Sequence, residues 1–403
     1  MIVTEIIAAL ATVSFAVTLW QWSAARKFPL HQRRARPDFA PALTLLKPLK
    51  GCDAETEFCV KSWLGQIYPG PMQILFGVAS SADPVCALVE KLIAQHPNCD
   101  AQLVVCPEVI GPNAKVSTLV QLEALAQNDF IIVSDADVHV PPDFLCSMVA
   151  PLQDSKTGLV SCLHSLGNPA NLAMHFEAVA INADFWSMVL QGRTIRPLDF
   201  AMGAVMAVRS EVLKKIGGFR VLADYLADDY QLGHRVFEAG FKVELCPLVA
   251  ECREAPTTWR QVWSHQLRWA RTVRVCMPGG YFFSIIGNVT LWSVILLCLA
   301  FPKSELIERS FSSQNSWRVF EFDLNWLCIP GALFLLARIL IAVDLEWRMT
   351  RSTRHCNYFW LVPLRDLAAA VLWALSFLGN RIEWRGRIFR VRRGGKLTAV
   401  DGD

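Results

Sequence analysis

Two aspartates separated by one residue follow an apolar run near the middle of the chain. The run FIIVS leads directly to Asp135, Ala136 and Asp137. Two carboxylates at the end of a strand can bind a divalent cation together with a diphosphate, and an all-oxygen site favours Mg²⁺ or Mn²⁺ over zinc. The cation acts there as a Lewis acid that neutralises charge on a leaving nucleoside diphosphate. Because many surface turns also contain this DAD triplet, the interpretation needs support from other residues.

Three more acids lie close together farther along the chain. Asp224, Asp228 and Asp229 fall within six residues, just before an amphipathic helical pattern. Acids this close repel one another, which raises the pKa of at least one of them. A carboxylate of this kind is suited to act as a general base toward a hydroxyl group. Capping of the following helix by Asp228 or Asp229 is the alternative.

Two residues ahead of the DAD triplet are candidates for contacts with a nucleotide. Asp83 follows the apolar run ILFGVASS by a few residues, a position where acids often hold a ribose. Capping of a helix that begins at Pro84 is an equal alternative. Lys115, in the segment GPNAKVSTL, would meet a base or a phosphate if it enters the cleft. Otherwise Lys115 lies solvated at the start of a helix.

A segment dense in Trp and Arg lies just before a long apolar run. On a helix over about residues 257–275, its tryptophans would rest at a membrane interface as amphipathic anchors do. Arg268 and Trp269 would instead close over a diphosphate and an acceptor, since a guanidinium group fits phosphate well. Both roles are compatible, because the segment adjoins the apolar run.

All these candidates fall within residues 40–276, where short apolar runs alternate with helical patterns. The alternation is typical of an α/β domain. Strands are expected at 42–51, 72–80, 101–108 and 130–137, and helices at Glu55–Ile67, Pro84–Gln95 and Ala114–Ala126. Parallel strands place ligand-binding groups just beyond their carboxyl ends, and the acids named above follow such runs.

Length and composition limit the class of protein. The 403 residues suffice for one large domain with membrane anchors. Apolar residues make up 53% and charged residues 19%, and the longest apolar runs cluster at the two ends. A net charge of +3 does not indicate a partner nucleic acid. Thirteen scattered cysteines without a CxxC pair argue against a disulfide scaffold and fit reduced thiols in a cytosolic domain.

The N-terminal apolar run predicts a membrane anchor within residues 1–24. It extends over Ile2–Trp20 and contains one charged residue, Glu5. Basic residues follow this run and none precedes it, which indicates an uncleaved anchor rather than a signal peptide. These residues are Arg26, Lys27, Arg33, Arg34 and Arg36. By the positive-inside rule, the domain after the anchor is expected to be cytosolic.

Three further crossings are expected within residues 281–380, with buried soluble helices as the alternative. The apolar runs are Tyr281–Phe301, Leu324–Val343 and Phe359–Leu378. The charged residues inside them, Arg338, Arg365 and Asp366, are expected to pair, to reach the interface or to face protein. Four crossings are expected to return the chain to the cytosol.

The tail at residues 381–403 is strongly basic, as expected for a cytosolic segment. Its cations are Arg381, Arg385, Arg387, Arg390, Arg392, Arg393 and Lys396. The tail would also attract anionic lipid headgroups, although a plain topology signal explains it equally well.

Together, the order of these motifs between membrane anchors resembles the ceramide glucosyltransferases and the related bacterial hopanoid glycosyltransferases. Four stretches carry the resemblance: LLKPLKGCD, IIVSDAD, YLADDYQLG and EWRGRIFRVRRGG. It covers nearly the whole chain, and the combined motifs are far more specific than any one of them. The resemblance implies a GT-A-type nucleotide-sugar domain that inverts the anomeric centre in one displacement step.

The resemblance also assigns roles to the candidate residues. Asp83 would bind the nucleotide, Asp135 would serve the metal and diphosphate, and Asp137 would be a metal ligand. Asp229 would be the general base, with Asp228 next in line. Arg268 and Trp269 match the RW of the family's (Q/R)xxRW motif. His265 stands at the first position of that motif in place of Gln or Arg, with Gln266 out of register by one residue.

The resemblance makes UDP-glucose and ceramide the first choice of donor and acceptor. A hopanoid transferase that uses UDP-N-acetylglucosamine is the close alternative, because residues 170–198, expected to shape the acceptor pocket, match the family least. A processive polysaccharide synthase is disfavoured by His265 and by the small number of expected membrane helices. A membrane receptor or scaffold would not need an ordered set of carboxylates. Short loops and compact length favour a bacterial inner membrane over a Golgi membrane.

Overall fold

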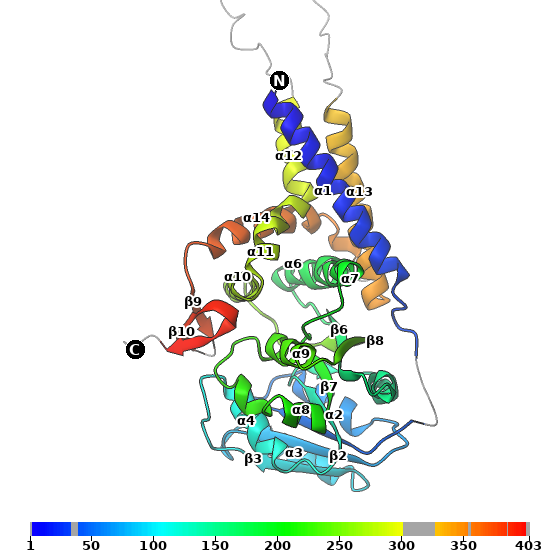
Figure 1. Cartoon of the computed structure of the whole chain (residues 1–403), viewed down its shortest axis with the longest axis vertical. Helices are drawn as coiled ribbons and strands as arrows, with labels where there is room; N and C mark the ends of the chain where they lie inside the picture. Colours follow the sequence, from blue (N-terminus) through cyan, green and yellow to red (C-terminus); the bar gives the residue numbers. More distant parts are fainter. Residues whose placement is uncertain (1, 34–38, 301–326, 354–355, 385, 400–403) are drawn as a thin grey trace, which may run out of the picture.

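An α/β domain lies at one end of the molecule and long helices project from the other (Figure 1). The computed structural model describes residues 2–33, 39–300, 327–353, 356–384 and 386–399. The projecting helices are α1 (Ile2–Lys27), α12 (Val289–Ala300) and α13 (Cys328–Thr350). Several residues named above lie outside the described part, among them Arg34, Arg36, Phe301, Leu324, Arg385 and residues 400–403.

The domain is built on an eight-stranded mixed sheet in the order β3-β2-β1-β4-β7-β6-β8-β5. The strands are β1 (Leu43–Pro48), β2 (Met72–Val78), β3 (Asp100–Val105), β4 (Phe130–Ser134), β5 (Val138–His139), β6 (Thr157–Leu166), β7 (Val205–Arg209) and β8 (Lys242–Cys252). β1 to β4 pair in parallel, and β7 runs antiparallel to both β4 and β6. The carboxyl ends of β1, β2, β4 and β6 therefore meet at one edge, together with the start of β7.

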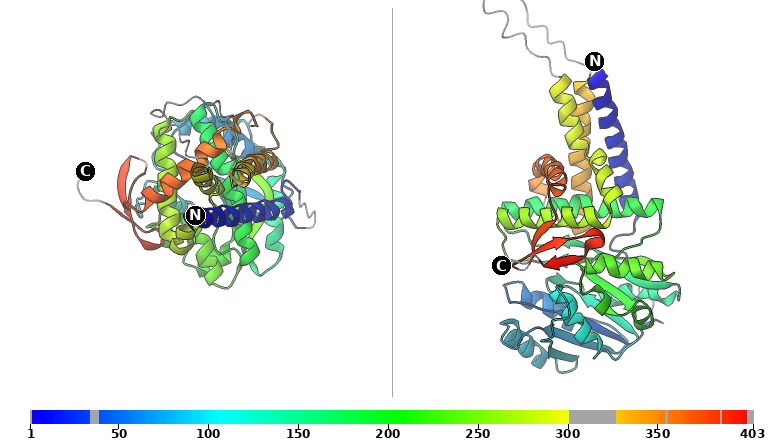
Figure 2. Two further views of the ribbon diagram at one scale, coloured as in Figure 1. Left: turned by 90° about the horizontal axis from the view of Figure 1, so that it is seen from above. Right: turned by 60° about the vertical axis from the view of Figure 1, so that its left-hand side comes forward.

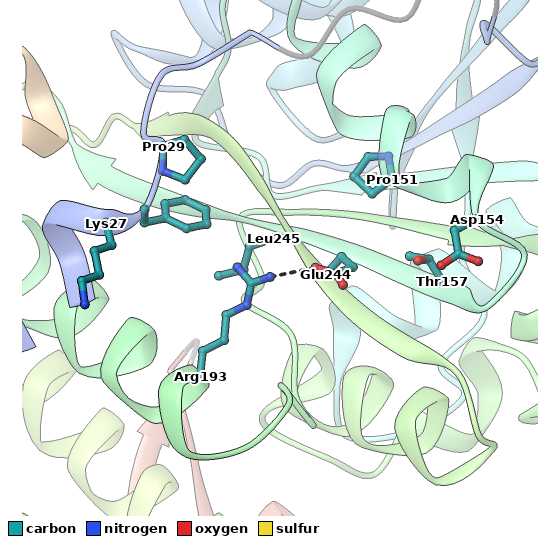
Figure 3. Close-up of a pocket in the computed structure, with 9 residues that line it drawn as sticks. Lys27, Pro29, Pro151, Asp154, Thr157, Arg193, Glu244 and Leu245 are labelled. Carbon is teal, nitrogen blue, oxygen red and sulfur yellow. Dashed lines mark hydrogen bonds and ion pairs between the residues drawn. The ribbon is translucent and has the colours of Figure 1, made fainter. Parts of the chain in front are cut away.

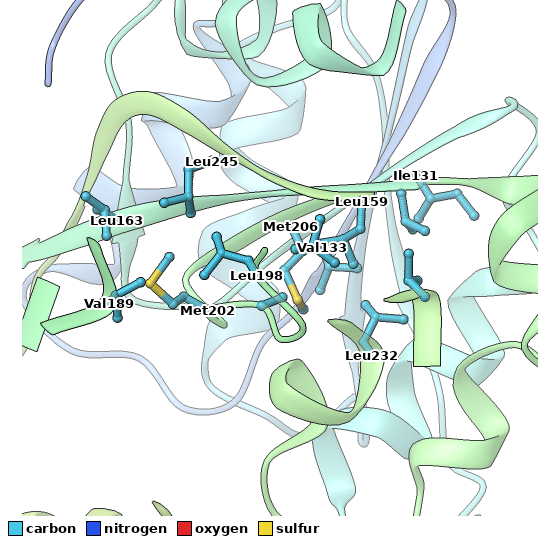
Figure 4. Close-up of a cluster of buried hydrophobic side chains, with 14 of the residues drawn as sticks. Ile131, Val133, Leu159, Leu163, Val189, Leu198, Met202, Met206, Leu232 and Leu245 are labelled. Carbon is cyan, nitrogen blue, oxygen red and sulfur yellow. The ribbon is translucent and has the colours of Figure 1, made fainter. Parts of the chain in front are cut away.

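Apolar side chains on both faces of the sheet explain why its strands appear in the sequence as continuous apolar runs. Along β4, Ile131 and Val133 enter one core, while Phe130 and Ile132 enter the other. Figure 4 shows the first core around Ile131, Val133 and Met206. The covering helices are α2 (Thr56–Leu64), α3 (Val85–Ala94), α4 (Ala114–Glu123), α5 (Phe144–Val149), α8 (Ser210–Lys215) and α9 (Asp228–Glu238). The predicted α/β class is confirmed.

A layer of helices separates the sheet from the projecting bundle (Figure 2). It contains α6 (Leu172–Ala180), the π-helical turn η2 (Ile181–Phe185), α7 (Trp186–Ile195) and α10 (Trp259–Cys276). α10 is the helix expected at about 257–275, and it begins with a capping box formed by Thr258 and Gln261. Its position between the domain and the bundle is compatible with the expected interfacial role.

The number of helices that could cross a membrane differs from the expected four. Among the described residues, α1 and α13 are long and apolar enough. A third crossing is formed if Pro278–Gly287 and Val289–Ala300, which meet at a 45° bend, act as one span. The segment α14 (Leu361–Ser376) has only 16 residues and runs across the bundle rather than along it (Figure 1). The last expected crossing is therefore not among the candidates.

The basic tail lies beside the α/β domain. It forms an antiparallel sheet of β9 (Arg381–Trp384), β10 (Arg387–Val391) and β11 (Leu397–Ala399), next to α10 (Figure 1). Four crossings would put the two ends of the chain on the same side of a membrane, in conflict with the expected cytosolic tail. An odd number of crossings removes this conflict, because the tail then shares a side with the domain.

Candidate active site

The DAD triplet follows β4 and is supported from behind by a buried lysine. Lys47, near the end of β1, is fully buried and donates to the hydroxyl of Ser134 at 3.2 Å and to the carbonyl oxygen of Asp135. Burial lowers the pKa of Lys47 to about 8, against the opposing effect of nearby acids. The sequence interpretation overlooked this residue. The available signal was a single charge within an otherwise apolar strand.

Lys115 connects the DAD triplet to the second acidic segment. Its ammonium lies 2.6 Å from Asp135 Oδ1 and 3.1 Å from Asp228 Oδ2. Burial acts to lower the pKa of Lys115, but the charges of Asp135 and Asp228 outweigh burial and the net shift is upward. Asn113 strengthens this connection, because it caps α4 and donates to Asp228 Oδ1 at 3.3 Å. Three separate sequence motifs therefore meet at one edge of the sheet.

Asp137 lies deeper in the same site. Burial raises the pKa of Asp137 to about 7, and the charges of Asp135 and Glu254 act in the same direction. Its backbone carbonyl accepts a hydrogen bond from Arg253 N at 2.9 Å, which ties the triplet to the end of β8. Burial is thus the larger cause of the shift, and the neighbouring acids add to it.

Asp229 is the second carboxyl with a raised pKa. Burial, and then the charge of Asp228, raises its pKa to about 7. Its Oδ1 accepts from Tyr230 N at 2.7 Å. Gly203, in the loop before β7, lies against this carboxyl: a Cβ atom there would be only 2.9 Å from Asp229 Oδ2. Because glycine has no side chain, the loop can approach Asp229 this closely. Helix α9 has Ala227 as its N-cap residue and shows no side-chain cap, so the capping alternative does not explain these acids.

Asp83 makes contacts that match its capping alternative. Its two oxygens accept from Gly51 N at 3.0 and 3.1 Å, and Oδ1 also accepts from Val85 N at 3.0 Å. These bonds fix the loop after β1 against the start of α3. Asp83 therefore shapes the loop at this edge of the sheet, and its contact with a nucleotide remains a prediction.

The residues of the HxxRW segment lie on α10. His265 Nδ1 lies 2.7 Å from Glu177 Oε1, and the ring of His265 meets that of Trp269 edge to face at 4.7 Å. Trp269 also packs against an apolar cluster at the junction of β6 and α6. Arg268 lies close enough to Glu254 for the two charges to interact. Glu177 was not predicted, and the available signal was a single acid within an otherwise apolar helix.

The donor set was tested for its fit to the expected divalent cation. No group of three His, Cys, Asp or Glu side chains within the described residues is arranged to hold a metal. However, Mg²⁺ and Mn²⁺ in nucleotide sites use one or two carboxylates and complete their shell with phosphate oxygens and water. Asp135 and Asp137 provide such oxygens, and the negative charges of Asp135 and Glu254 act on Asp137 in the same site. These residues fit the cation.

A shallow pocket lies elsewhere on the domain. It has a volume of about 410 Å³ and is lined by the ion pair of Arg193 and Glu244, by Asp154 and Thr157 and by the linker after α1 (Figure 3). Thr157 starts β6, whereas the acids gather where the strands end. The pocket is therefore separate from the acidic site.

Comparison with known proteins agrees with the motifs. A ceramide glucosyltransferase of Komagataella phaffii is 28% identical over 440 residues, covering 91% of this chain and 85% of that protein. Ceramide glucosyltransferase 3 of Caenorhabditis elegans is 21% identical over 382 residues, covering 92% and 77%. The solved mannosyltransferase PcManGT from Pyrobaculum calidifontis, in complex with GDP-Man and Mn²⁺, matches with a TM-score of 0.50 at 19% identity, covering 91% of this chain and 98% of that chain.

These matches confirm the resemblance to the ceramide glucosyltransferases and the GT-A-type fold. The profile of glycosyl transferase family 21 matches residues 3–397, which is nearly the whole chain. The match includes the acidic site, the helical layer and the tail sheet as far as the first residue of β11. The chain therefore belongs to glycosyl transferase family 21 and is a glycosyltransferase.

Proposed function

We propose that this glycosyltransferase moves a sugar from a UDP-sugar, with UDP-glucose as the first choice, to the hydroxyl group of a membrane lipid, with ceramide as the first choice. The reaction inverts the anomeric centre in a single displacement. The observation that carries this proposal is the partly buried carboxyl of Asp229 next to Asp228, with Lys115 between the two acidic segments.

In this reaction Asp229 acts as the general base. A pKa near 7 leaves a substantial part of the carboxyl ionised at neutral pH and still basic enough to accept a proton. Asp229 takes the proton of the acceptor hydroxyl while the acceptor oxygen forms its bond to the anomeric carbon. The bond from that carbon to the diphosphate breaks at the same time, and UDP leaves. The contact with Tyr230 N keeps the carboxyl oriented.

Asp135 and Asp137 would hold a Mg²⁺ or Mn²⁺ ion. When bound, the cation would supply Lewis-acid neutralisation of the charge on the diphosphate. Lys115 and the backing cation Lys47 limit repulsion between the acids and the incoming phosphates. The Mn²⁺ and nucleotide sugar bound to the mannosyltransferase PcManGT are compatible with this assignment.

The remaining donor contacts are assigned to Asp83, Arg268 and Trp269. Asp83 holds the loop after β1 in place and would face the nucleotide across that loop. Arg268 would bind phosphate through its planar guanidinium. The indole of Trp269 packs next to Leu166 at the end of β6 and would close over the donor from this apolar side.

The position of the helices supports a lipid acceptor. Anchors on both sides of the domain hold its helical layer next to the bundle, so that a lipid hydroxyl and a soluble sugar nucleotide meet at one surface. Arg26 and Lys27 in the last turn of α1, and Arg33 after it, favour a cytosolic domain. The bacterial inner membrane is the favoured location.

A lipid assay tests the proposal. Membranes that contain the protein would receive Mg²⁺ and labelled UDP-glucose or UDP-N-acetylglucosamine, with ceramide or a hopanoid alcohol. Membranes with Asp229→Asn serve as the matched control. Labelled glucosylceramide from the native protein alone supports the proposal. If only the hopanoid is labelled, the proposed mechanism stands and the acceptor is a hopanoid in place of ceramide. If a polymer is labelled and no lipid is, the proposed transfer to a lipid is wrong.

A further inference from the structure

Glu177 is a buried carboxyl in the layer between the domain and the bundle. It lies on α6 and is 3% exposed. One of its carboxylate oxygens makes hydrogen bonds with two side chains of α10. His265 Nδ1 lies 2.7 Å from Glu177 Oε1, and Gln266 Nε2 donates to the same oxygen at 3.0 Å. A carboxylate oxygen accepts, so Nδ1 donates to Glu177, and the other ring nitrogen, Nε2, is left for a second polar partner.

The ring of His265 keeps part of its surface open. The side chain is 24% exposed, and within the described residues its only hydrogen-bond partner is Glu177. The indole of Trp269 packs edge to face against the ring at 4.7 Å and restricts its rotation. The imidazole is therefore fixed on one side by a buried carboxylate and on another by an aromatic ring, while Nε2 stays available.

His265 lies between the acidic site and the membrane side of the domain. The partly buried residue His164, near the end of β6, is close enough to Asp135 and to His265 for its pKa to respond to the charge of both. On the opposite face of α6, Phe176 and Val179 pack against residues of α13 and α14. A head group that enters from the bundle along α6 would therefore meet His265 before it reaches the acids.

The backbone around Glu177 is also fixed. The π-helical turn η2 follows α6, and turns of this type are frequent at functional sites. Within it, the amide of Asn182 accepts from Leu166 N at 2.9 Å and donates to Leu166 O at 3.1 Å. This pairing attaches α6 to the end of β6, which holds Glu177 at a constant distance from the sheet edge.

We propose that His265, oriented by Glu177, binds the polar head group of the lipid acceptor through Nε2. The ligand class is a lipid that presents a hydroxyl or an amide N–H next to its reacting hydroxyl. His265 and Glu177 position the acceptor and take no proton from the reacting oxygen. This inference rests on the proposed transfer to a membrane lipid.

Three variants test the role of the pair in steady-state kinetics, with the lipid acceptor varied at saturating UDP-sugar and metal. His265→Ala and Glu177→Gln are expected to raise the KM for the acceptor at least about tenfold, with kcat changed much less. His265→Gln should recover much of the loss, because an amide can donate to Glu177 and accept from the lipid. A purely structural role would not separate KM from kcat in this way.

The control is Glu238→Gln, which changes an exposed glutamate that lies 3.4 Å from His234 at the end of α9. UDP binding, measured by calorimetry, should be unchanged in all variants and shows that they are folded. An unchanged acceptor KM in folded His265→Ala would overturn the inference. If the native protein itself released no UDP in response to lipid, the proposed function would fail instead, so the two failures are distinguishable.

Discussion

The ammonium of Lys115 lies 2.6 Å from a carboxylate oxygen of Asp135, although the two residues follow different strands of the sheet. Lys115 stands in the first turn of α4, and its other contact is Asp228 at 3.1 Å. One cation thus serves both acidic segments and reduces the repulsion between them. The site depends on this cation before any ligand arrives.

Replacement of Lys115 by Gln keeps the length of the side chain and removes its charge. The acids would then repel each other and the incoming diphosphate, so the affinity for UDP is expected to fall at least about tenfold. Calorimetric titration with UDP in the presence of Mn²⁺ measures this loss. Lys61→Gln, at an exposed ion pair with Glu57, is the matched control and should leave affinity unchanged. Native affinity in Lys115→Gln would contradict a donor-binding role.

The rate of transfer should depend on pH through Asp229. Its pKa is raised to about 7 by burial and by Asp228, and only the ionised form can accept a proton. The value of kcat should therefore fall as pH decreases through 7, by about tenfold per unit well below that value. Saturating donor and metal keep Asp137 ionised, so the profile then reports Asp229. A flat profile between pH 5.5 and 8, an interval of about one unit or more on each side of the expected value, would count against Asp229 as the base.

Removal of the divalent cation should abolish both donor binding and transfer. Chelation is expected to stop the reaction, and added Mn²⁺ or Mg²⁺ should restore it. Asp137→Asn should raise the metal concentration needed for half-maximal activity by about tenfold or more, because one charged ligand is lost. Asp143→Asn, at an acid beyond the triplet, serves as the control. Full activity in the chelator would refute the metal assignment.

A buried ion pair joins α13 of the bundle to α14, the helix that runs across it. Arg338 on α13 makes two hydrogen bonds of 2.9 Å to Asp366 on α14, and both residues are buried. Arg338→Met would leave Asp366 buried without its partner, at a cost of about 3–5 kcal/mol. Thermal unfolding in detergent should show a lower midpoint, and Arg338→Met combined with Asp366→Leu should recover part of it. A single variant as stable as the native protein would contradict this account.

The tail sheet should be necessary for full activity. Leu397 is buried in the cluster that joins this sheet to α10 and to Leu226, just before the acidic segment. Leu397→Asp would bury a charge and separate the sheet from the domain, so kcat is expected to fall at least about tenfold. Ala399→Asp, on the same strand but exposed, is the matched control. Equal activity of the two variants would exclude a role for the sheet.

Local patterns were sufficient to predict the first half of the domain. Runs such as FIIVS are apolar on both faces, so they mark buried strands, and the DAD triplet lies directly after β4 as expected. The helices at α2, α3 and α4 begin and end within a few residues of their predicted bounds. Asp135 and Asp228 come close enough to share Lys115 because of the order of the strands in the sheet. No local sequence pattern gives that order, so only the resemblance could predict this contact.

Features that depend on distant contacts were not predictable. Glu177 is a single acid in an apolar helix, and its role becomes visible only when α10 brings His265 beside it. In α14, composition favoured a crossing, but Arg365 pairs with Asp184 at 2.7 Å and holds the helix against the layer. Their separation in sequence leaves no local pattern that would reveal this contact.

The contacts of the tail sheet determine when, during synthesis of the chain, the acidic site can be completed. Leu226 N donates to the carbonyl of Gly395 at 3.0 Å, and Leu397 N donates to that of Asp224 at 2.7 Å, so the loop before Asp228 is paired with residues that follow the whole bundle. Chains are synthesised from the N-terminus, and early segments fold first. The acids are therefore made long before the strand that braces their loop. The braced site forms only after α13 and α14 are in place, so a partly synthesised chain lacks it until synthesis has passed the bundle.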